Sequence, residues 1–270
     1  MVDIAIIGAG PAGLSAAINA HARGRTAVVL GRSRETSFIY KAEKIDNVLG
    51  FPGLSGRDMI DKFYAHAEES GVSIRIGRVL QILPMGDYFS INFDNNVVDA
   101  KTIILATGIV KGNQIEGEDE FLGLGVSYCA TCDAMLYRQK TVVLVGDSDE
   151  AAADFDFLSK VVAKVHWVKS GAKKVVGDDF VRALETDEGT IPCDGVFFVK
   201  ETMPFESLIS GIELKDGMVV VDRLQQTNIP GVFAAGDCTG WPYQLPKAVG
   251  EGLVAAQQAD RFLRRTDLVV

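Results

Sequence analysis

Short runs of apolar residues alternate along the chain with stretches in which apolar residues recur every three or four positions. Residues 4–7 and 27–30 are uninterrupted apolar runs of strand length, as in strands that are buried on both faces of a parallel sheet. Between them, residues 14–18 continue from a glycine-rich turn into a helical pattern. A strand, a turn, a helix and a second strand in this order predict a β-α-β unit and therefore the α/β fold class.

The next part of the chain predicts one helix and several strands. Residues 56–70 have a helical pattern whose apolar stripe consists of Met59, Ile60, Phe63, Tyr64 and Ala67. Three short segments follow as strands, which we expect to build a small sheet layered on the first unit: residues 73–76, 79–83 and 88–93. Residues 102–108 are a further buried strand that ends in a turn of small residues.

The strand, turn and helix pattern recurs over residues 141–158, and the strands that follow it predict a second, smaller Rossmann-like unit: residues 165–168 and 195–199. The last third of the chain returns to the first unit with two strands and a helix, at residues 217–221, within 227–237, and at 247–263. The apolar stripe predicted for that helix is Val249, Leu253, Ala256, Ala259 and Phe262. We therefore expect a discontinuous first domain, 1–111 and 201–270, with a domain of residues 112–200 inserted into it.

Composition and charge exclude several functional classes. The 270 residues are 47% hydrophobic and 23% charged, which is typical of a soluble globular protein with two domains. A net charge of −9 argues against nucleic acid as a partner, because phosphate binding needs a basic surface. The longest apolar runs are too short to span a membrane, and residues 1–3 lead into a strand without the basic leader of a secretory signal. With isolated cysteines elsewhere in the chain, this favours the cytoplasm.

The first glycine-rich turn has the spacing of a dinucleotide fingerprint. Gly8 allows the tight turn, Gly10 lets the backbone approach a pyrophosphate, and Gly13 lets the helix pack on the strand. The alternative is a turn that binds nothing. The acid that usually contacts the ribose is replaced by Gly31, and Glu35 is a candidate substitute.

A C-x-x-C motif with an adjacent acid, Cys129, Cys132 and Asp133, lies between the two strand-turn-helix units. Two thiols at this spacing can close a small disulfide ring, and one thiolate can attack a partner disulfide while the other resolves the intermediate. Half of a zinc site is the alternative, but a tetrahedral site needs two further clustered ligands. The remaining cysteines, Cys193 and Cys238, are isolated, and we expect them to be buried and not catalytic.

The second glycine-bearing turn differs from the first. Ser148 stands where the middle glycine would lie, and carboxylates at Asp147, Asp149 and Glu150 would repel the phosphate of a dinucleotide. Lysines at 169, 173 and 174 follow the next strand, where they could meet a 2′-phosphate or simply form a solvated surface loop.

These motifs together resemble the low-molecular-weight thioredoxin reductases, which are FAD-dependent disulfide oxidoreductases, and the resemblance covers nearly the whole chain. The resemblance implies an FAD-binding first domain and an inserted NAD(P)H-binding-like domain. It also implies that Cys132 faces the flavin, that Cys129 attacks the substrate disulfide, and that Asp133 serves as acid or base. The residues that it implies at the cofactor are Gly8, Gly10, Pro11, Ala12, Gly13, Asn47, Ala106, Thr107, Gly108, Gly236, Asp237, Gln244 and Leu245.

The altered second turn is similar to that of the ferredoxin-dependent flavin thioredoxin reductases, in which ferredoxin replaces NADPH. By this resemblance the partners are thioredoxin as electron acceptor, ferredoxin as donor and a second copy of the chain in a homodimer, with no metal. Lys169, Lys173 and Lys174 are candidates for ferredoxin docking. Three alternatives stay open: an NADPH-dependent reductase with an unusual phosphate turn, a relative with a second flavin in its second domain, and a flavin redox sensor that does not turn over.

Overall fold

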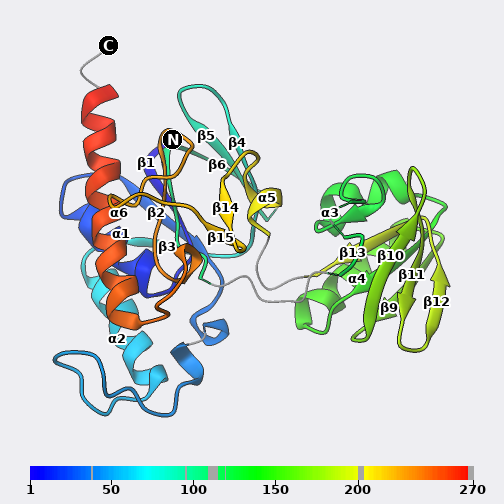
Figure 1. Ribbon diagram of the computed structural model, residues 1–270, viewed down its shortest axis with the longest axis horizontal. Coiled ribbons are helices and arrows are strands. Elements are labelled where there is room, and N and C mark those ends of the chain that lie inside the picture. The colour runs from blue at the N-terminus through cyan, green and yellow to red at the C-terminus, as the bar shows by residue number, and fades with distance from the viewer. Residues whose placement is uncertain (38, 95, 109–114, 119, 200–203, 267–270) are drawn as a thin grey trace. The chain divides into compact units, whose positions relative to one another are not determined.

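The computed structural model describes residues 1–37, 39–94, 96–108, 115–118, 120–199 and 204–266, apart from the side chain of Cys132. The chain divides into two compact units (Figure 1). Unit 1 consists of Met1–Val110 and Pro204–Val270, and unit 2 consists of Lys111–Met203.

Unit 1 is built on one sheet with the strand order β3-β2-β1-β6-β5-β4, and β16 pairs with β6 off this path. The strands are β1 (Val2–Ile7), β2 (Ala27–Gly31), β3 (Ser73–Ile76), β4 (Val79–Pro84), β5 (Phe89–Phe93), β6 (Asn96–Leu105) and β16 (Val232–Ala234). Residues 4–7 of β1 are buried, as the uninterrupted apolar run predicts. The parallel pairs of β1 with β2 and β6, and of β6 with β16, form a Rossmann-like half sheet.

The prediction of a separate small sheet was wrong, and the length of β6 is the reason. Residues 96–100 of β6 pair antiparallel with β5, whereas residues 102–105 pair in parallel with β1. One strand therefore joins the β4-β5 hairpin to the parallel sheet, and β3 lies at the parallel edge beside β2. The strand predicted over 217–221 is also shorter: β15 (Met218–Val219) pairs only with β14 (Leu214–Lys215).

The helices of unit 1 are α1 (Pro11–His21), α2 (Gly56–Glu69), α5 (Phe205–Leu208) and α6 (Leu245–Thr266), with short 3₁₀ turns η1 (Arg34–Thr36), η2 (Ile39–Lys41) and η4 (Asp237–Thr239). The prediction for α2 is confirmed. The Ser55 hydroxyl accepts a hydrogen bond from the Asp58 amide and caps the helix, and all residues of the predicted stripe are buried except Phe63, which is half-buried.

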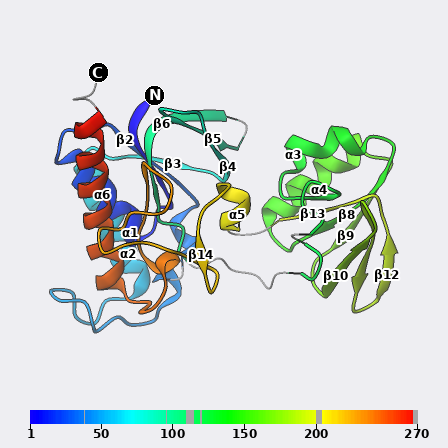
Figure 2. The same cartoon turned by 45° about the horizontal axis from the view of Figure 1, so that its top comes forward.

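Helix α6, near the C-terminus, packs alongside α1, near the N-terminus (Figure 2). Small residues allow this close packing. A Cβ added at Gly252 would lie 2.1 Å from the Ala12 carbonyl oxygen, so only glycine allows this approach. The Ser15 hydroxyl donates to the Val249 carbonyl oxygen at 2.7 Å. The apolar stripe predicted for α6 was partly wrong, because the side chains of Val249, Leu253 and Phe262 are only half-buried. The buried face consists of Ala248, Gly252, Ala255, Ala256, Ala259, Asp260 and Leu263.

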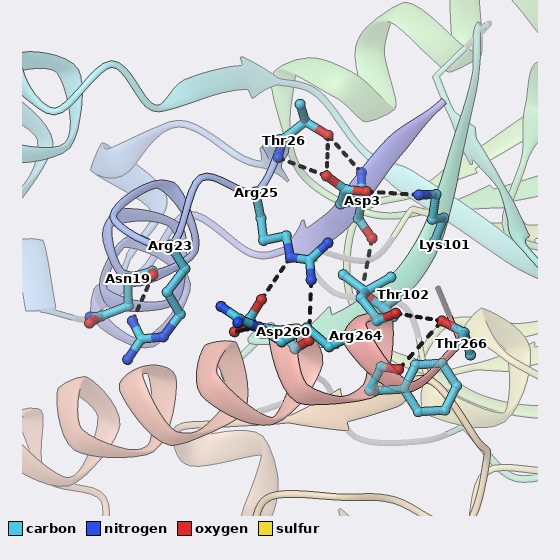
Figure 3. Close-up of polar contacts among 12 residues, drawn as sticks. Asp3, Asn19, Arg23, Arg25, Thr26, Lys101, Thr102, Asp260, Arg264 and Thr266 are labelled. Atoms are coloured by element: carbon cyan, nitrogen blue, oxygen red, sulfur yellow. Dashed lines mark hydrogen bonds and ion pairs between the residues drawn. The ribbon is translucent and has the colours of Figure 1, made fainter. Parts of the chain in front are cut away.

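Asp260 is the charged residue on that face. Its carboxylate accepts hydrogen bonds from Arg25 Nε at 2.7 Å and from Arg264 Nε at 3.0 Å (Figure 3). Burial by itself would raise the pKa of Asp260, but the hydrogen bonds and charges of the two arginines lower it below its ordinary value. The group therefore links α6 to the segment between α1 and β2.

Unit 2 contains a parallel sheet in the order β7-β13-β8-β9, with α4 packed against it. Its elements are β7 (Val126–Ser127), α3 (Ala130–Asp133), η3 (Ala134–Tyr137), β8 (Thr141–Val145), α4 (Asp149–Val161), β9 (Lys164–Val168) and β13 (Gly195–Phe198). The predicted strand-turn-helix is confirmed. The α/β class with two Rossmann-like units, carrying parallel and antiparallel pairs, is confirmed as well.

Sequence reasoning missed the second sheet of unit 2. This sheet is antiparallel, in the order β10 (Ala172–Gly177), β11 (Val181–Thr186) and β12 (Gly189–Pro192). Lysine, arginine, glutamate and threonine interrupt the apolar residues of these strands, so no long apolar run marked them. None of the described helices is both long and apolar enough to cross a membrane.

Candidate active site

The first glycine-rich turn is packed tightly on one side and open on the other. Gly8 has φ +119°, and a Cβ there would lie 2.2 Å from the Ala106 carbonyl oxygen. A Cβ at Gly13 would lie 1.9 Å from the Gly8 carbonyl oxygen, whereas one at Gly10 would meet nothing within 4 Å. Pro11 is the first helical residue, and no side chain caps α1. The helix N-terminus therefore presents free backbone N–H groups beside open space.

Gly31 explains why the expected ribose acid is missing. A Cβ at this position would lie 2.6 Å from the Ala9 amide nitrogen, so no carboxylate side chain fits at the end of β2. Glu35 lies in η1 with an exposed side chain, 3.6 Å from Arg34 Nε. Its contact with a ribose stays a prediction.

Two adjacent strand ends face the same edge of the unit 1 sheet. Strands β6 and β16 are parallel neighbours, so Thr107 and Gly236 follow them at one edge, where α/β sheets bind ligands. Gly108 and Gly236 have positive φ values of +73° and +87°. The Thr107 hydroxyl is buried and lacks a hydrogen-bond partner among the described residues. A buried hydroxyl of this kind is suited to a ligand atom.

The turn at Gly236 is held by a network that sequence reasoning missed. The Lys247 ammonium donates to the carbonyl oxygens of Gly236 and Gly240 at 2.7 and 2.8 Å and contacts the Glu251 carboxylate at 3.0 Å. The Glu251 carboxylate in turn accepts from the Gly236 amide at 2.8 Å. The sequence contains a signal for this network, because Lys247 and Glu251 are four residues apart at the start of α6, shortly after the Gly236-Asp237 turn.

Asp237 lies half-buried in this network. Burial raises the pKa of its carboxyl group, and the nearby Lys247 lowers it only in part. No hydrogen bond to the Asp237 carboxylate is found within the described residues. A ligand hydroxyl would provide the missing donor.

Asn47 and Gln244 are brought together across 197 residues of chain. The Asn47 amide donates to the Gln244 side-chain oxygen at 2.7 Å. Leu245 is the first residue of α6. Ala12 is buried, and a Cβ at Gly236 would lie 2.8 Å from the Ala12 Cβ. All the predicted cofactor residues lie in unit 1.

The redox motif lies in unit 2, at the start of α3. Cys129 is 8% exposed and disulfide-bonded, and its sulfur lies 3.5 Å from the Thr131 hydroxyl. The Ser127 hydroxyl donates to the Asp133 carboxylate at 2.7 Å and accepts from the Cys129 amide at 3.0 Å. The side chain of Cys132 lies outside the described residues. No group of three or more possible metal ligands is found in the described part of the chain.

The second glycine-bearing turn already carries negative charge at its helix. The Ser148 hydroxyl accepts from the Ala151 amide at 3.1 Å and caps α4, whose first turn contains Asp149 and Glu150. The carbonyl oxygen of Gly146 is already engaged in a hydrogen bond, which it accepts from the Trp167 indole N–H at 2.8 Å.

Of the three predicted docking lysines, Lys169 and Lys173 are exposed and Lys174 is half-buried, and each has an acidic partner. Lys169 lies 3.3 Å from Asp147, Lys173 lies 2.7 Å from Asp187, and Lys174 lies 2.7 Å from Glu116. Binding of a phosphate or of an acidic protein here would require these pairs to open. The docking role stays a prediction.

Comparison with known proteins decides the family. The family described as pyridine nucleotide-disulphide oxidoreductase matches residues 2–170 and 156–252. The chain belongs to this family. Among the pyridine nucleotide-disulphide oxidoreductases, the thioredoxin reductase of Aquifex aeolicus is 32% identical over 97% of this chain and 93% of its own.

Two solved structures resemble the chain as a whole. A ferredoxin-flavin thioredoxin reductase from Clostridium acetobutylicum superposes with a TM-score of 0.91 at 41% identity, covering 98% of each chain. A thioredoxin reductase from Gloeobacter violaceus gives a TM-score of 0.80 at 29% identity, covering 98% of this chain and 95% of that one. The chain is therefore similar to thioredoxin reductases over nearly its whole length, and membership of the pyridine nucleotide-disulphide oxidoreductase family implies a flavin. The unpartnered Thr107 hydroxyl, the open Gly10 and the free Asp237 carboxylate fit such a group.

Asp237→Asn is expected to weaken flavin binding about ten- to a hundredfold, because a hydrogen bond from a flavin hydroxyl to residue 237 would lose its charged acceptor. Protonation of Asp237 has the same effect. Since burial raises the pKa of Asp237, the wild type should lose flavin on acidification at a higher pH than an ordinary aspartate would allow. Equilibrium dialysis of flavin between pH 4 and 8 measures both effects. Asp216→Asn, on the exposed β14-β15 turn, is the control, and equal affinities in the two variants would contradict the role of Asp237.

Cys193 and Cys238 are confirmed as buried, and both are free thiols. Burial raises the pKa of each to about 12, so neither forms a thiolate near neutral pH. Iodoacetamide at pH 8 should therefore leave both unlabelled in the folded protein and label both in urea, as read by peptide mass spectrometry. Rapid labelling of Cys238 in the folded protein would show that its site opens.

Proposed function

We propose that the protein is an FAD-dependent reductase of thioredoxin that receives its electrons from reduced ferredoxin. The observation that carries the choice of donor is the turn between β8 and α4. The N-terminus of α4 is capped by Ser148, and the carboxylates of Asp149 and Glu150 lie in its first turn. The Clostridium acetobutylicum structure, described as a ferredoxin-flavin enzyme, supports the same choice.

Electrostatics explains why this turn is unsuited to NADPH. A helix N-terminus favours one negative group near its free N–H groups, and side chains of α4 already provide it. A pyrophosphate at the same place would face unit charges at close range, and each repulsion costs about 4 kcal/mol at 4 Å for an effective dielectric constant of 20. In unit 1, by contrast, α1 has no acidic residue in its first turn and no capping side chain. The first turn therefore suits a dinucleotide and the second does not.

The proposed FAD-binding domain consists of residues 1–111 and 201–270, and the proposed redox domain of residues 112–200. Bound FAD would accept electrons one at a time and release them as a pair. The N-terminus of α1 would hold the pyrophosphate and Asp237 a ribityl hydroxyl. Asn47, Gln244 and Leu245 would border the flavin ring.

The thiol pair would carry out the exchange with thioredoxin. In the reduced protein, the Cys129 thiolate attacks one sulfur of the thioredoxin disulfide, and the other sulfur leaves as a thiolate. Cys132 then attacks the Cys129 sulfur, which closes the Cys129–Cys132 disulfide and releases the second thioredoxin thiolate. Asp133, held by the Ser127 hydroxyl, would exchange protons with the thiols. The net reaction transfers two electrons and two protons to thioredoxin.

Met135 and Leu136 support a protein substrate at this motif. They lie three and four residues after Cys132 and are 61% and 69% exposed, so they offer an apolar contact close in sequence to the thiols. A homodimer and a cytoplasmic location belong to the same proposal.

Anaerobic reduction of the purified protein tests the donor. NADPH, NADH and reduced ferredoxin are supplied separately while flavin absorbance and thioredoxin thiols are measured. We expect bleaching and catalytic thiol formation with ferredoxin alone. Rapid bleaching by micromolar NADPH would establish the nicotinamide-dependent alternative. Two FAD per chain would establish a second flavin site, and bleaching without turnover would establish a sensor.

A further inference from the structure

A buried carboxyl group lies next to the redox motif and has no part in the chemistry described so far. The Glu118 side chain is completely buried. One of its oxygens accepts a hydrogen bond from the Tyr128 hydroxyl at 2.5 Å, and the other accepts from the Ile115 amide at 2.9 Å. Tyr128 is itself buried and directly precedes Cys129 in the chain.

The segment that carries Glu118 is anchored to the antiparallel sheet of unit 2. The Val175 amide donates to the Glu116 carbonyl oxygen at 2.8 Å, and Glu116 forms a parallel bridge with Lys174 of β10. A Cβ at Gly117 would lie 2.4 Å from the Val175 carbonyl oxygen, so the two backbones are in close contact. Glu118 is therefore fixed to a sheet edge and presents a rigid acceptor to Tyr128.

Cys129 is consequently held from two sides. On one side its amide donates to the Ser127 hydroxyl, which also binds Asp133. On the other side, the hydroxyl of the preceding residue, Tyr128, donates to the Glu118 carboxylate. The Tyr128 ring also packs near the Phe198 ring, with centroids 6.4 Å apart. A nucleophile must approach a disulfide along a defined line, so the orientation of the Cys129 backbone affects the reaction rate.

We propose that Glu118 and Tyr128 act as one unit that positions Cys129 for attack on the substrate disulfide. Both side chains are buried and contact each other, so they act through Cys129 and are positioning residues. Burying a carboxyl group is costly unless it is fully hydrogen-bonded, and this pair meets that condition directly beside the redox motif. The proposal rests on the proposed role of Cys129 as the attacking thiol.

Two measurements test the pair with Tyr128→Phe, Glu118→Gln and the double variant. The first is a single turnover, in which protein reduced by stoichiometric dithionite is mixed with oxidised thioredoxin. The second is the iodoacetamide reaction rate of Cys129 against pH in a Cys132→Ser background. Tyr137→Phe is the matched control, because Tyr137 is also buried in unit 2 and its hydroxyl has no hydrogen-bond partner among the described residues. Thermal unfolding and flavin content are recorded for every variant.

We expect each single variant to slow thiol transfer about tenfold, the scale of a small misplacement of a reacting group, with unchanged flavin content. The double variant should be no slower than the slower single variant, because the two residues act through one contact. The Tyr137→Phe control should transfer thiols at the wild-type rate.

Wild-type transfer and alkylation rates in Tyr128→Phe and Glu118→Gln, with lowered thermal stability, would overturn the proposal and leave a purely structural contact. Multiplying effects in the double variant would also overturn it. Failure of the proposed function looks different: the Cys132→Ser protein with intact Tyr128 would then form no adduct with thioredoxin.

Discussion

The Cys132→Ser variant is expected to capture thioredoxin in a stable mixed disulfide, whereas Cys129→Ser should neither capture nor reduce it. If Cys129 attacks, removing the resolving thiol stops the reaction after its first bond has formed. If the attacking thiol is removed, transfer should fall by more than about a thousandfold, as expected when a nucleophile is lost. Non-reducing mass spectrometry of the reduced variant mixed with thioredoxin measures capture.

A matched control comes from the same unit. Cys193→Ala removes a buried thiol that does not form a thiolate near neutral pH, so capture and turnover should match the wild type. Capture by Cys129→Ser in place of Cys132→Ser would show that the two cysteines have exchanged the proposed roles.

Asp260→Ala should lower the local free energy of unfolding of unit 1 by about 3 kcal/mol, the usual cost of leaving a buried ion pair without one partner. The Asp260 side chain is only 9% exposed and that of Arg25 15%, so solvent screens this pair poorly. Asp156→Ala removes a carboxylate that is 70% exposed and paired with Lys160 on α4, and it should cost less than about 1 kcal/mol. Hydrogen exchange of amides in α1, α6 and α4 measures each effect in its own unit.

Acidification should remove the contribution of Asp260 to the stability of unit 1. Because the pKa of Asp260 is lowered in the folded protein, its stabilisation is complete above the ordinary aspartate pKa of 3.8 and disappears as pH falls through the folded value. The difference between the wild type and Asp260→Ala should therefore be constant at neutral pH and shrink in strong acid. A difference that shrinks between pH 7 and pH 5 would contradict a lowered pKa.

Local patterns predicted the elements that lie in the buried centre of each unit. The runs at residues 4–7, 27–30 and 141–145 were found because parallel strands covered on both faces are continuously apolar. The start of β6 was missed because residues 96–100 include polar positions. Strands β10 and β11 were missed because charged residues interrupt their apolar residues, and β12 because it has only four residues. Alanine and glycine on α6 carry little apolar signal, yet they form its buried face against α1.

Candidate site residues were predictable where a local conformation requires them. Gly8 and Gly13 are examples, since backbone atoms leave no room there for a side chain. Contacts across the fold were not predictable from spacing: Asn47 meets Gln244 only because the tertiary structure joins distant segments. Glu118 gave no signal either, because a lone glutamate in a polar stretch does not reveal a buried hydrogen bond to Tyr128.

The discontinuity of unit 1 has a consequence for synthesis on the ribosome. Strand β16 and helix α6 complete the sheet and cover α1, but they emerge only after all of Lys111–Met203 has been made. Unit 2 can thus fold while the first 110 residues are still incompletely folded. The small-residue face of α1 and one edge of β6 are then uncovered. In the newly made chain, the fold of unit 1 should therefore be completed last, although its first strand is made first.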